Sequence, residues 1–168
     1  VRPPLGSFVR TDSSAIFGVV SQVITEPLDS SRPVLARGGA ASTEDEVFRD
    51  SPQISRLLTT RFDTIITGHL SDGIWKQFLP PLPPTVHSFV YLCSTEEVSR
   101  FTADFAFLSL ILHSGVGVAD EVASACLRAA AAAWTDKDAF LGRASRALAG
   151  ELANDLPRLN SVLRRGAS

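Results

Sequence analysis

A histidine, a serine and an aspartate lie close together in the sequence, and these are the residue types of a nucleophilic hydrolase. His69, Ser71 and Asp72 fall in the string GHLSDG. A catalytic triad needs three groups that converge from separate elements beside an oxyanion donor, and the chain has no Gly-x-Ser-x-Gly elbow. The Asp-Gly pair is typical of a tight turn. We therefore interpret the string as a turn, and a hydrolase centred on His69 and Asp72 is an alternative.

Residue types that bind metals are present, but their spacing is wrong. No two of the three histidines have the one-turn spacing of a zinc-binding helix. They are His69, His87 and His113. Cys93 and Cys126 are too far apart for a metal knuckle, and two cysteines make no disulfide framework. The sequence predicts structural histidines, buried cysteines in a reducing compartment and no metal site.

Glycine pairs and an acidic run also fail as sites. Gly38-Gly39 has no following Gly-Lys-Ser/Thr, and the Gly115 to Gly117 string has neither a preceding strand nor a third glycine, so neither predicts a phosphate loop. The acids from Glu44 to Glu46 are typical of a solvated loop. We predict no cofactor and no catalytic residue, so the chain is not expected to be an enzyme.

The least ordinary string is PPLPP at residues 80–84, which two aromatic residues precede. It is interpreted as a stiff, extended approach to the next strand, or as a polyproline ligand for an aromatic groove. Aromatic anchors on a rigid backbone are typical of interface hot spots. The candidate partner-binding residues are Trp75, Phe78, Leu79, Pro80, Pro81, Pro83 and Pro84. A buried core competes as the explanation for Phe78 and Leu79.

The composition narrows the class of protein that must position these residues. The chain has 168 residues, of which 45% are hydrophobic and 20% are charged, so some apolar surface is expected to be covered by a partner. Basic and acidic residues number 16 and 18, and this balance disfavours direct nucleic-acid binding. The longest apolar run, at residues 105–112, is shorter than the roughly 18 residues of a membrane span. We expect a cytoplasmic protein.

Before Ser94, short apolar runs separated by Pro, Gly, Ser and Asp predict strands. The expected strands cover residues 5–10, 15–25, 32–37, 61–70 and 86–93. Gly18 interrupts the second one and indicates a bulge or bend. Residues 38–46 are expected to be a polar loop and residues 52–58 a short helix capped by Ser51. Five or six short strands with such bends favour a small closed β-barrel.

After Ser94, Ala, Leu and Arg recur at helical spacing. Ser94 and Glu97 form a capping box for a helix that ends at Gly115 or just before it. A second helix is expected from about 118 to 134, a third opens with a weaker capping box at 135–138, and a fourth begins at Asp155. One face of the first helix carries Val98, Phe101, Phe105, Leu108 and Leu112. The sequence predicts a bundle of three or four helices.

Four short strings, in this order, resemble a known family. They are GSFVR at 6–10, IFGVV at 16–20, IITG at 65–68 and LPPLPP at 79–84. Their order and spacing resemble the HAS-barrel, the small N-terminal β-barrel of HerA-type DNA-translocating ATPases and of the α and β subunits of rotary ATP synthases. The resemblance covers about residues 5–93. The family's ATPases continue into a nucleotide-binding core, whereas this chain continues into helices without a phosphate loop.

The resemblance implies a role in ring assembly and partner docking, with a NurA-type nuclease of DNA end processing as the partner class of the HerA group. It implies no catalytic residue. The family's strand before the first motif is absent or lies upstream of Val1, so closure of the barrel within this chain stays open. The absence of Met from the sequence suggests that the numbering begins inside a longer product.

We therefore predict an α+β chain with a HAS-barrel-like β-barrel at residues 1–93 and a helical bundle at 94–168. The expected function is a non-enzymatic assembly or adaptor module that binds a protein, either itself or a ring ATPase of DNA processing. Small-residue helix faces and the apolar excess favour this function. The alternative is a nucleic-acid-binding β-barrel in DNA processing.

Overall fold

A computed structural model describes residues 2–12, 15–27 and 58–167 of the chain. The expected strand at 32–37, the polar loop at 38–46 and all but the last residue of the expected helix at 52–58 lie outside the described residues. Strands and helices are both present, so the predicted α+β class is confirmed.

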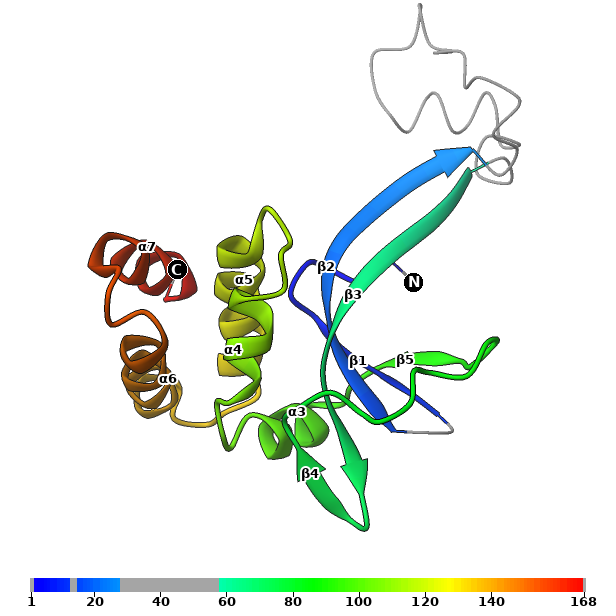
Figure 1. Ribbon diagram of the computed structural model, residues 1–168, viewed down its shortest axis with the longest axis horizontal. Helices are drawn as coiled ribbons and strands as arrows, with labels where there is room; N and C mark the ends of the chain where they lie inside the picture. The colour runs from blue at the N-terminus through cyan, green and yellow to red at the C-terminus, as the bar shows by residue number, and fades with distance from the viewer. Residues whose placement is uncertain (1, 13–14, 28–57, 168) are drawn as a thin grey trace, which may run out of the picture.

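Five antiparallel strands form a curled half-barrel in the order β4-β3-β2-β1-β5. They are β1 (Phe8–Thr11), β2 (Ile16–Pro27), β3 (Leu58–Ser71), β4 (Ile74–Lys76) and β5 (Val90–Leu92). β4 and β5 are the two edges, so the described part of the sheet is open (Figure 1). β4 was not among the expected strands, and β5 is shorter than the strand expected at 86–93.

Bulges and one glycine curl the sheet. The pairing of β2 with β3 shifts register after Phe17 and again after Val20. A side chain at Gly18 would lie 3.1 Å from the Ile65 carbonyl oxygen, which is closer than most real contacts. The prediction of a bulge at Gly18 is therefore confirmed.

The string that contains His69, Ser71 and Asp72 ends β3 and turns into β4. Asp72 and Gly73 have φ values of 52° and 75°, the left-handed conformations that a two-residue hairpin turn of type I′ requires. The prediction of a turn is confirmed.

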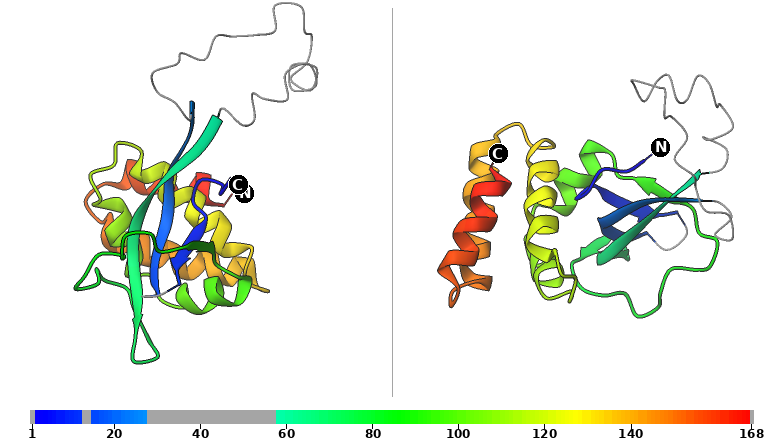
Figure 2. Two further views of the ribbon diagram at one scale, coloured as in Figure 1. Left: turned by 90° about the vertical axis from the view of Figure 1, so that its right-hand side faces the viewer. Right: turned by 90° about the horizontal axis from the view of Figure 1, so that it is seen from above.

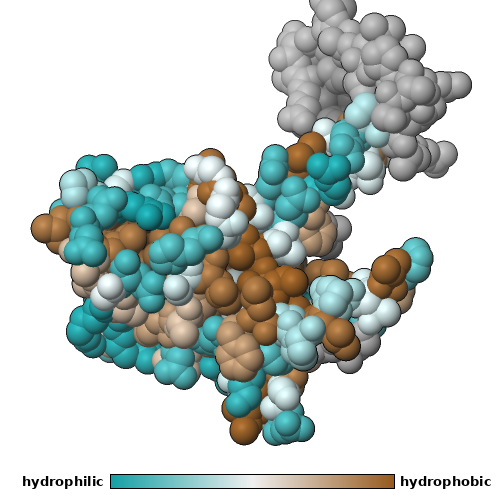
Figure 3. Space-filling view, in the orientation of Figure 1, coloured by the Kyte–Doolittle hydropathy of each residue, from teal (hydrophilic) through white to brown (hydrophobic). Residues whose placement is uncertain are grey.

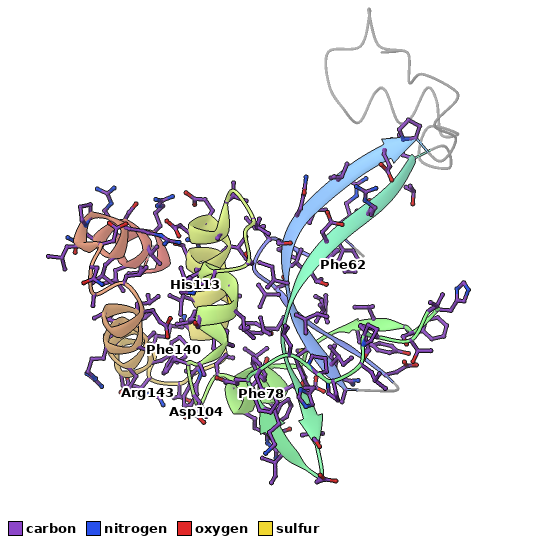
Figure 4. All side chains as sticks on the ribbon, viewed as in Figure 1. Phe62, Phe78, Asp104, His113, Phe140 and Arg143 are labelled. Atoms are coloured by element: carbon purple, nitrogen blue, oxygen red, sulfur yellow. The ribbon has the colours of Figure 1, made fainter. Side chains whose placement is uncertain are left out.

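Beyond the sheet, β2 and β3 continue as a two-stranded arm. Pairing runs from Val23 opposite Phe62 to Pro27 opposite Leu58, and the arm points away from the helices (Figure 1). Phe62 is labelled on it in Figure 4.

Five helices follow the strands. They are α3 (Thr95–Phe101), α4 (Phe107–Leu112), α5 (Ala119–Ala131), α6 (Lys137–Glu151) and α7 (Leu156–Gly166). The predicted capping box of Ser94 and Glu97 is confirmed, as is Asp155 as the cap of the last helix. The cap of α6 is Asp136, whose side chain accepts from the Ala139 N–H, so the capping box expected from Thr135 is wrong.

The single helix expected from Ser94 to Gly115 is also wrong, because the chain breaks between α3 and α4. The Gln77 side chain donates to the Phe101 carbonyl and accepts from the Phe107 N–H, so it satisfies backbone groups at both helix ends. The apolar face predicted for that helix still points inward. Val98, Phe101, Leu108 and Leu112 are buried and Phe105 is half-buried.

The elements form three layers, with the sheet on one side, α4 and α5 in the middle and α6 and α7 outside (Figure 2). One aromatic cluster joins the sheet to the helices, since the Phe17 and Phe101 rings stack with centroids 5.2 Å apart and Phe8 meets Phe107 at 5.9 Å. α7 is held to α5 by Arg158, whose guanidinium donates to both Asp120 oxygens at 2.7–3.0 Å. Strands and helices therefore share one core.

Candidate partner-binding surface

Trp75 packs against the core of the protein. Its ring lies 4.5 Å from the Phe17 ring and 5.9 Å from the Phe101 ring, centroid to centroid. The side chain is half-buried. The structure therefore separates Trp75 from the candidate residues that follow it in the sequence.

Phe78 and Leu79 are at the surface, with exposed fractions of 56% and 58%. Pro81 and Pro83 are exposed, whereas Pro80 and Pro84 are half-buried. Leu82, which the sequence analysis did not single out, is 74% exposed. Residues 77–89 form neither helix nor strand, and they pass over the face of the sheet that points away from the helices (Figures 2 and 4).

Gln77 anchors the start of this segment. Its Nε2 donates to the carbonyls of Phe101 at 2.6 Å and of Asp104 at 3.1 Å, and its Oε1 accepts from the Phe107 N–H at 3.1 Å. Three hydrogen bonds at one half-buried side chain fix where the segment leaves the core. A lone glutamine in the sequence carries no signal of this role.

His69 also contacts this segment, at Phe78. Its Nδ1 lies 3.2 Å from the Phe78 carbonyl oxygen, and its ring meets the Phe78 ring edge-on at 5.2 Å. The Ser71 hydroxyl donates to Asp72 within the exposed turn. The structure thus pairs His69 with Phe78 and Ser71 with Asp72, so it does not join the three in a catalytic relay.

Neither cysteine is placed as a metal ligand or a nucleophile. Burial, and next the negative charge of Glu97, raise the pKa of the Cys93 thiol to about 12. Burial alone raises the pKa of Cys126. Among the described residues, no three His, Cys, Asp or Glu side chains are grouped closely enough to hold a metal ion. The acidic run at 44–46 lies outside that part of the chain.

Exposed apolar side chains concentrate in one stretch, which we call the apolar band. It comprises Ile74, Phe78, Leu79, Leu82, Val86, Phe89, Val90, Tyr91 and Leu92. These are nine of the fourteen large hydrophobic residues found exposed in the described chain. Figure 3 shows hydrophobic surface at the projecting end beside β5 and at the β3–β4 hairpin. Such a concentration marks an interaction surface, whereas scattered exposed residues would not.

A strained turn presents the middle of the band. The Ser88 N–H donates to the Thr85 carbonyl at 3.0 Å, and His87 at the third position has φ 70°. Glycine is the favoured residue for that conformation. The flanking Val86 and Phe89 are 80% and 70% exposed. Local strain that displays apolar groups to solvent is typical of a functional site.

β5 is a free edge. The Cys93 N–H donates to the Phe8 carbonyl and the Asp12 N–H to the Phe89 carbonyl. Because antiparallel bonds alternate, the backbone groups of Val90 and Leu92 point away from β1. All three residues of β5 are 46% exposed.

An ion pair ties this edge to α3. Arg10 donates to Glu97, and its guanidinium lies 5.5 Å from the centre of the Tyr91 ring. Burial by itself would raise the pKa of Glu97, but hydrogen bonds from the Ser94 backbone and from Arg10 outweigh it and lower that pKa below its ordinary value. Neither Arg10 nor Glu97 was singled out by sequence as belonging to the surface.

Among the hollows of the described residues, two lie between the strands and α5. A notch of about 240 Å³ lies between β5, α3 and the end of α5, and its lining includes Leu92, Cys93 and three alanines, Ala129, Ala132 and Ala133. A wider groove of about 600 Å³ lies between the N-terminal segment, the base of the arm and α5, where exposed Leu5, Val23 and Val118 meet. Both are mainly apolar, and no sequence motif marks either of them.

Comparisons of the chain with protein-family models, with curated proteins and with solved structures give no match. In the described part of the chain, no helix combines the length and the apolar character that crossing a membrane needs.

Proposed function

We propose that this chain is a non-enzymatic assembly or adaptor module that binds a protein through the apolar band. The observation that carries the proposal is the concentration of nine exposed large hydrophobic side chains within residues 74–92. Leaving such a stretch in water is costly, at roughly 25 cal/mol for each Å² of apolar surface. A partner that covers the band recovers this free energy.

The start of the apolar segment is held in a defined position, which supports a role in binding. Gln77 and His69 fix residues 77 and 78 by hydrogen bonds, so Phe78 and Leu79 are held at the surface in a defined position. A preorganised surface loses little conformational entropy when it binds.

The partner class comes from the resemblance. The strings at residues 6–10, 16–20 and 65–68 fall at β1, β2 and β3, and the proposal of a partner rests on their resemblance to the HAS-barrel strings. We propose a HerA-type ATPase, or a second copy of the chain, as the partner, and propose that closure of the half-barrel needs strands that the described residues do not supply.

The first test is direct binding between the purified chain and a purified HerA-type ATPase from the same genome, measured by interferometry. The variant Phe78→Ser/Leu82→Ser is expected to weaken binding by about 30-fold or more, as loss of hot-spot residues does. The matched control is Leu156→Ser on α7, because Leu156 is 62% exposed but lies outside the band.

Equal weakening by the control would show that general surface hydrophobicity, and not the band, governs the interaction. If the unmodified chain neither binds the ATPase nor associates with itself, both proposed partner classes are contradicted.

A further inference from the structure

We propose that two copies of this chain pair through their β5 strands, antiparallel about a two-fold axis at Tyr91, with Phe89 of each copy in the notch of the other. The inference deepens the assembly function proposed above and rests on it. It names the partner, a second copy, and the atoms that meet.

The backbone of β5 is self-complementary. The N–H and C=O groups of Val90 and Leu92 point away from β1, as the bonds of Cys93 and Asp12 to that ladder require. Two such edges placed antiparallel and centred on Tyr91 set Val90 opposite Leu92 in both directions. Four backbone hydrogen bonds then form, and Tyr91 meets Tyr91 of the second copy as a close, non-hydrogen-bonded pair.

The same register places a protruding side chain over a hollow. Phe89 of one copy falls opposite Cys93 of the other. Both side chains lie on the helix side of the sheet, because Phe89, Tyr91 and Cys93 pair with β1 positions on the side of Phe8. Cys93 lines the notch of about 240 Å³, and a cavity of about 150 Å³ is enough to take up benzene. Phe89 is 70% exposed, so its ring is free to enter the notch of the second copy.

The other edge of the sheet is less suited to pairing. β4 ends at Lys76, and a lysine on an edge strand opposes strand addition. β5 has no charge, no proline and no bulge. An unprotected edge with 46% exposed residues is a liability unless another strand covers it.

The experiment measures the mass of the 168-residue chain by light scattering over a concentration series. Twice the 18.0 kDa of one chain is expected. Phe89→Ser and Ala132→Leu, which fills the notch, are each expected to raise the dissociation constant by about 30-fold or more. Val90→Pro removes an outward-pointing N–H without breaking the hydrogen bonds to β1. The same rise in the dissociation constant is expected. Leu156→Ser on α7, at a residue that is 62% exposed but lies outside the band and the notch, is the matched control and should leave the dimer unchanged.

A covalent test fixes the symmetry without depending on stability. In Tyr91→Cys, the two introduced thiols meet across the axis at a spacing that suits a disulfide, so mild oxidation by molecular oxygen, which is reduced to peroxide, should give a cross-linked dimer. Ile74→Cys, on the other edge strand and at a residue that is 56% exposed against 46% for Tyr91, should stay monomeric on a denaturing gel.

A chain that is monomeric throughout the series would overturn the pairing, and so would a dimer that survives Phe89→Ser and Val90→Pro without the Tyr91 cross-link. A monomer that still binds the ATPase through Phe78 and Leu82 would remove the β5 dimer and leave the proposed function intact.

Discussion

Gly68 and Gly142 are the same residue type in opposite surroundings. A side chain at Gly68 would lie 2.3 Å from the Lys76 carbonyl oxygen and 2.9 Å from the Phe101 ring, whereas nothing lies within 4 Å at Gly142. Gly68→Ala is expected to destabilise the fold by about 1–3 kcal/mol, because backbone and ring must move apart. Gly142→Ala in α6 is expected to stabilise it by about 0.5–1 kcal/mol. Urea unfolding midpoints measure both, and shifts of the same sign would contradict the contrast.

The sequence identified aromatic residues as candidates for binding, but it did not predict which of them are exposed. Trp75 and Phe78 were grouped as aromatic anchors beside the rigid proline string, yet one packs on Phe17 and the other is 56% exposed. The difference arises at Gln77, which pins the chain to the α3–α4 junction. Its partners are 24 and 30 residues away, so no local pattern indicates the contact.

The contact between β1 and α3 depends on pH through Glu97. Its pKa is lowered in the folded chain, so the unfolded chain binds a proton more readily. The stabilisation is therefore present above the ordinary carboxyl pKa and is lost as the pH falls through the lower, folded value.

We expect Glu97→Gln to be less stable than the unmodified chain at neutral pH. The difference in stability should vanish as the pH falls below the folded pKa of Glu97, where the carboxyl is protonated in both states. Gln keeps the capping box but not the charge. Urea midpoints from neutral pH downward measure it, and Glu96→Gln, which pairs with Arg100 on the surface, is the control. A constant difference at every pH would argue against the ion pair.

The ends of helices were predictable where a nearby residue sets them and not where a residue far along the chain does. The caps at Ser94 and Asp155 were predictable, since each satisfies backbone N–H groups within its own first turn. The break between α3 and α4 was not, because its cause is a side chain that follows β4. β4 itself is only three residues long, too short for an alternating pattern to show.

The whole molecule is expected to unfold as one unit, because Phe8 and Phe17 of the sheet pack on Phe101 and Phe107 of the helices. The two tryptophans offer separate probes, with Trp75 in β4 and Trp134 after α5. In Trp134→Phe the fluorescence reports the sheet, and in Trp75→Phe it reports the helices.

Each single-tryptophan variant is expected to give a fluorescence transition in urea that coincides with its own transition by far-ultraviolet circular dichroism. Two separated transitions in either variant would instead indicate that residues 1–93 and 94–168 are independent domains.

The α+β class was predictable from the change in composition near Ser94, because strand and helix patterns are local. The order of the strands was not. β5 pairs with β1 across some eighty residues of chain, and such a long-range pairing leaves no periodic trace. The openness of the half-barrel depends on that order, so a closed barrel was an equally consistent expectation from the strands alone.

The shared core has a consequence for synthesis on the ribosome. Translation delivers β1 to β5 before the helices, yet Phe8, Phe17 and Val19 are buried against side chains of the helical half. Until α4 and α5 leave the exit tunnel, the inner face of the sheet has no cover, and exposed apolar surface of this kind is what chaperones bind. From the order of elements along the chain we expect the nascent protein to need chaperone cover for as long as its helices are still being made.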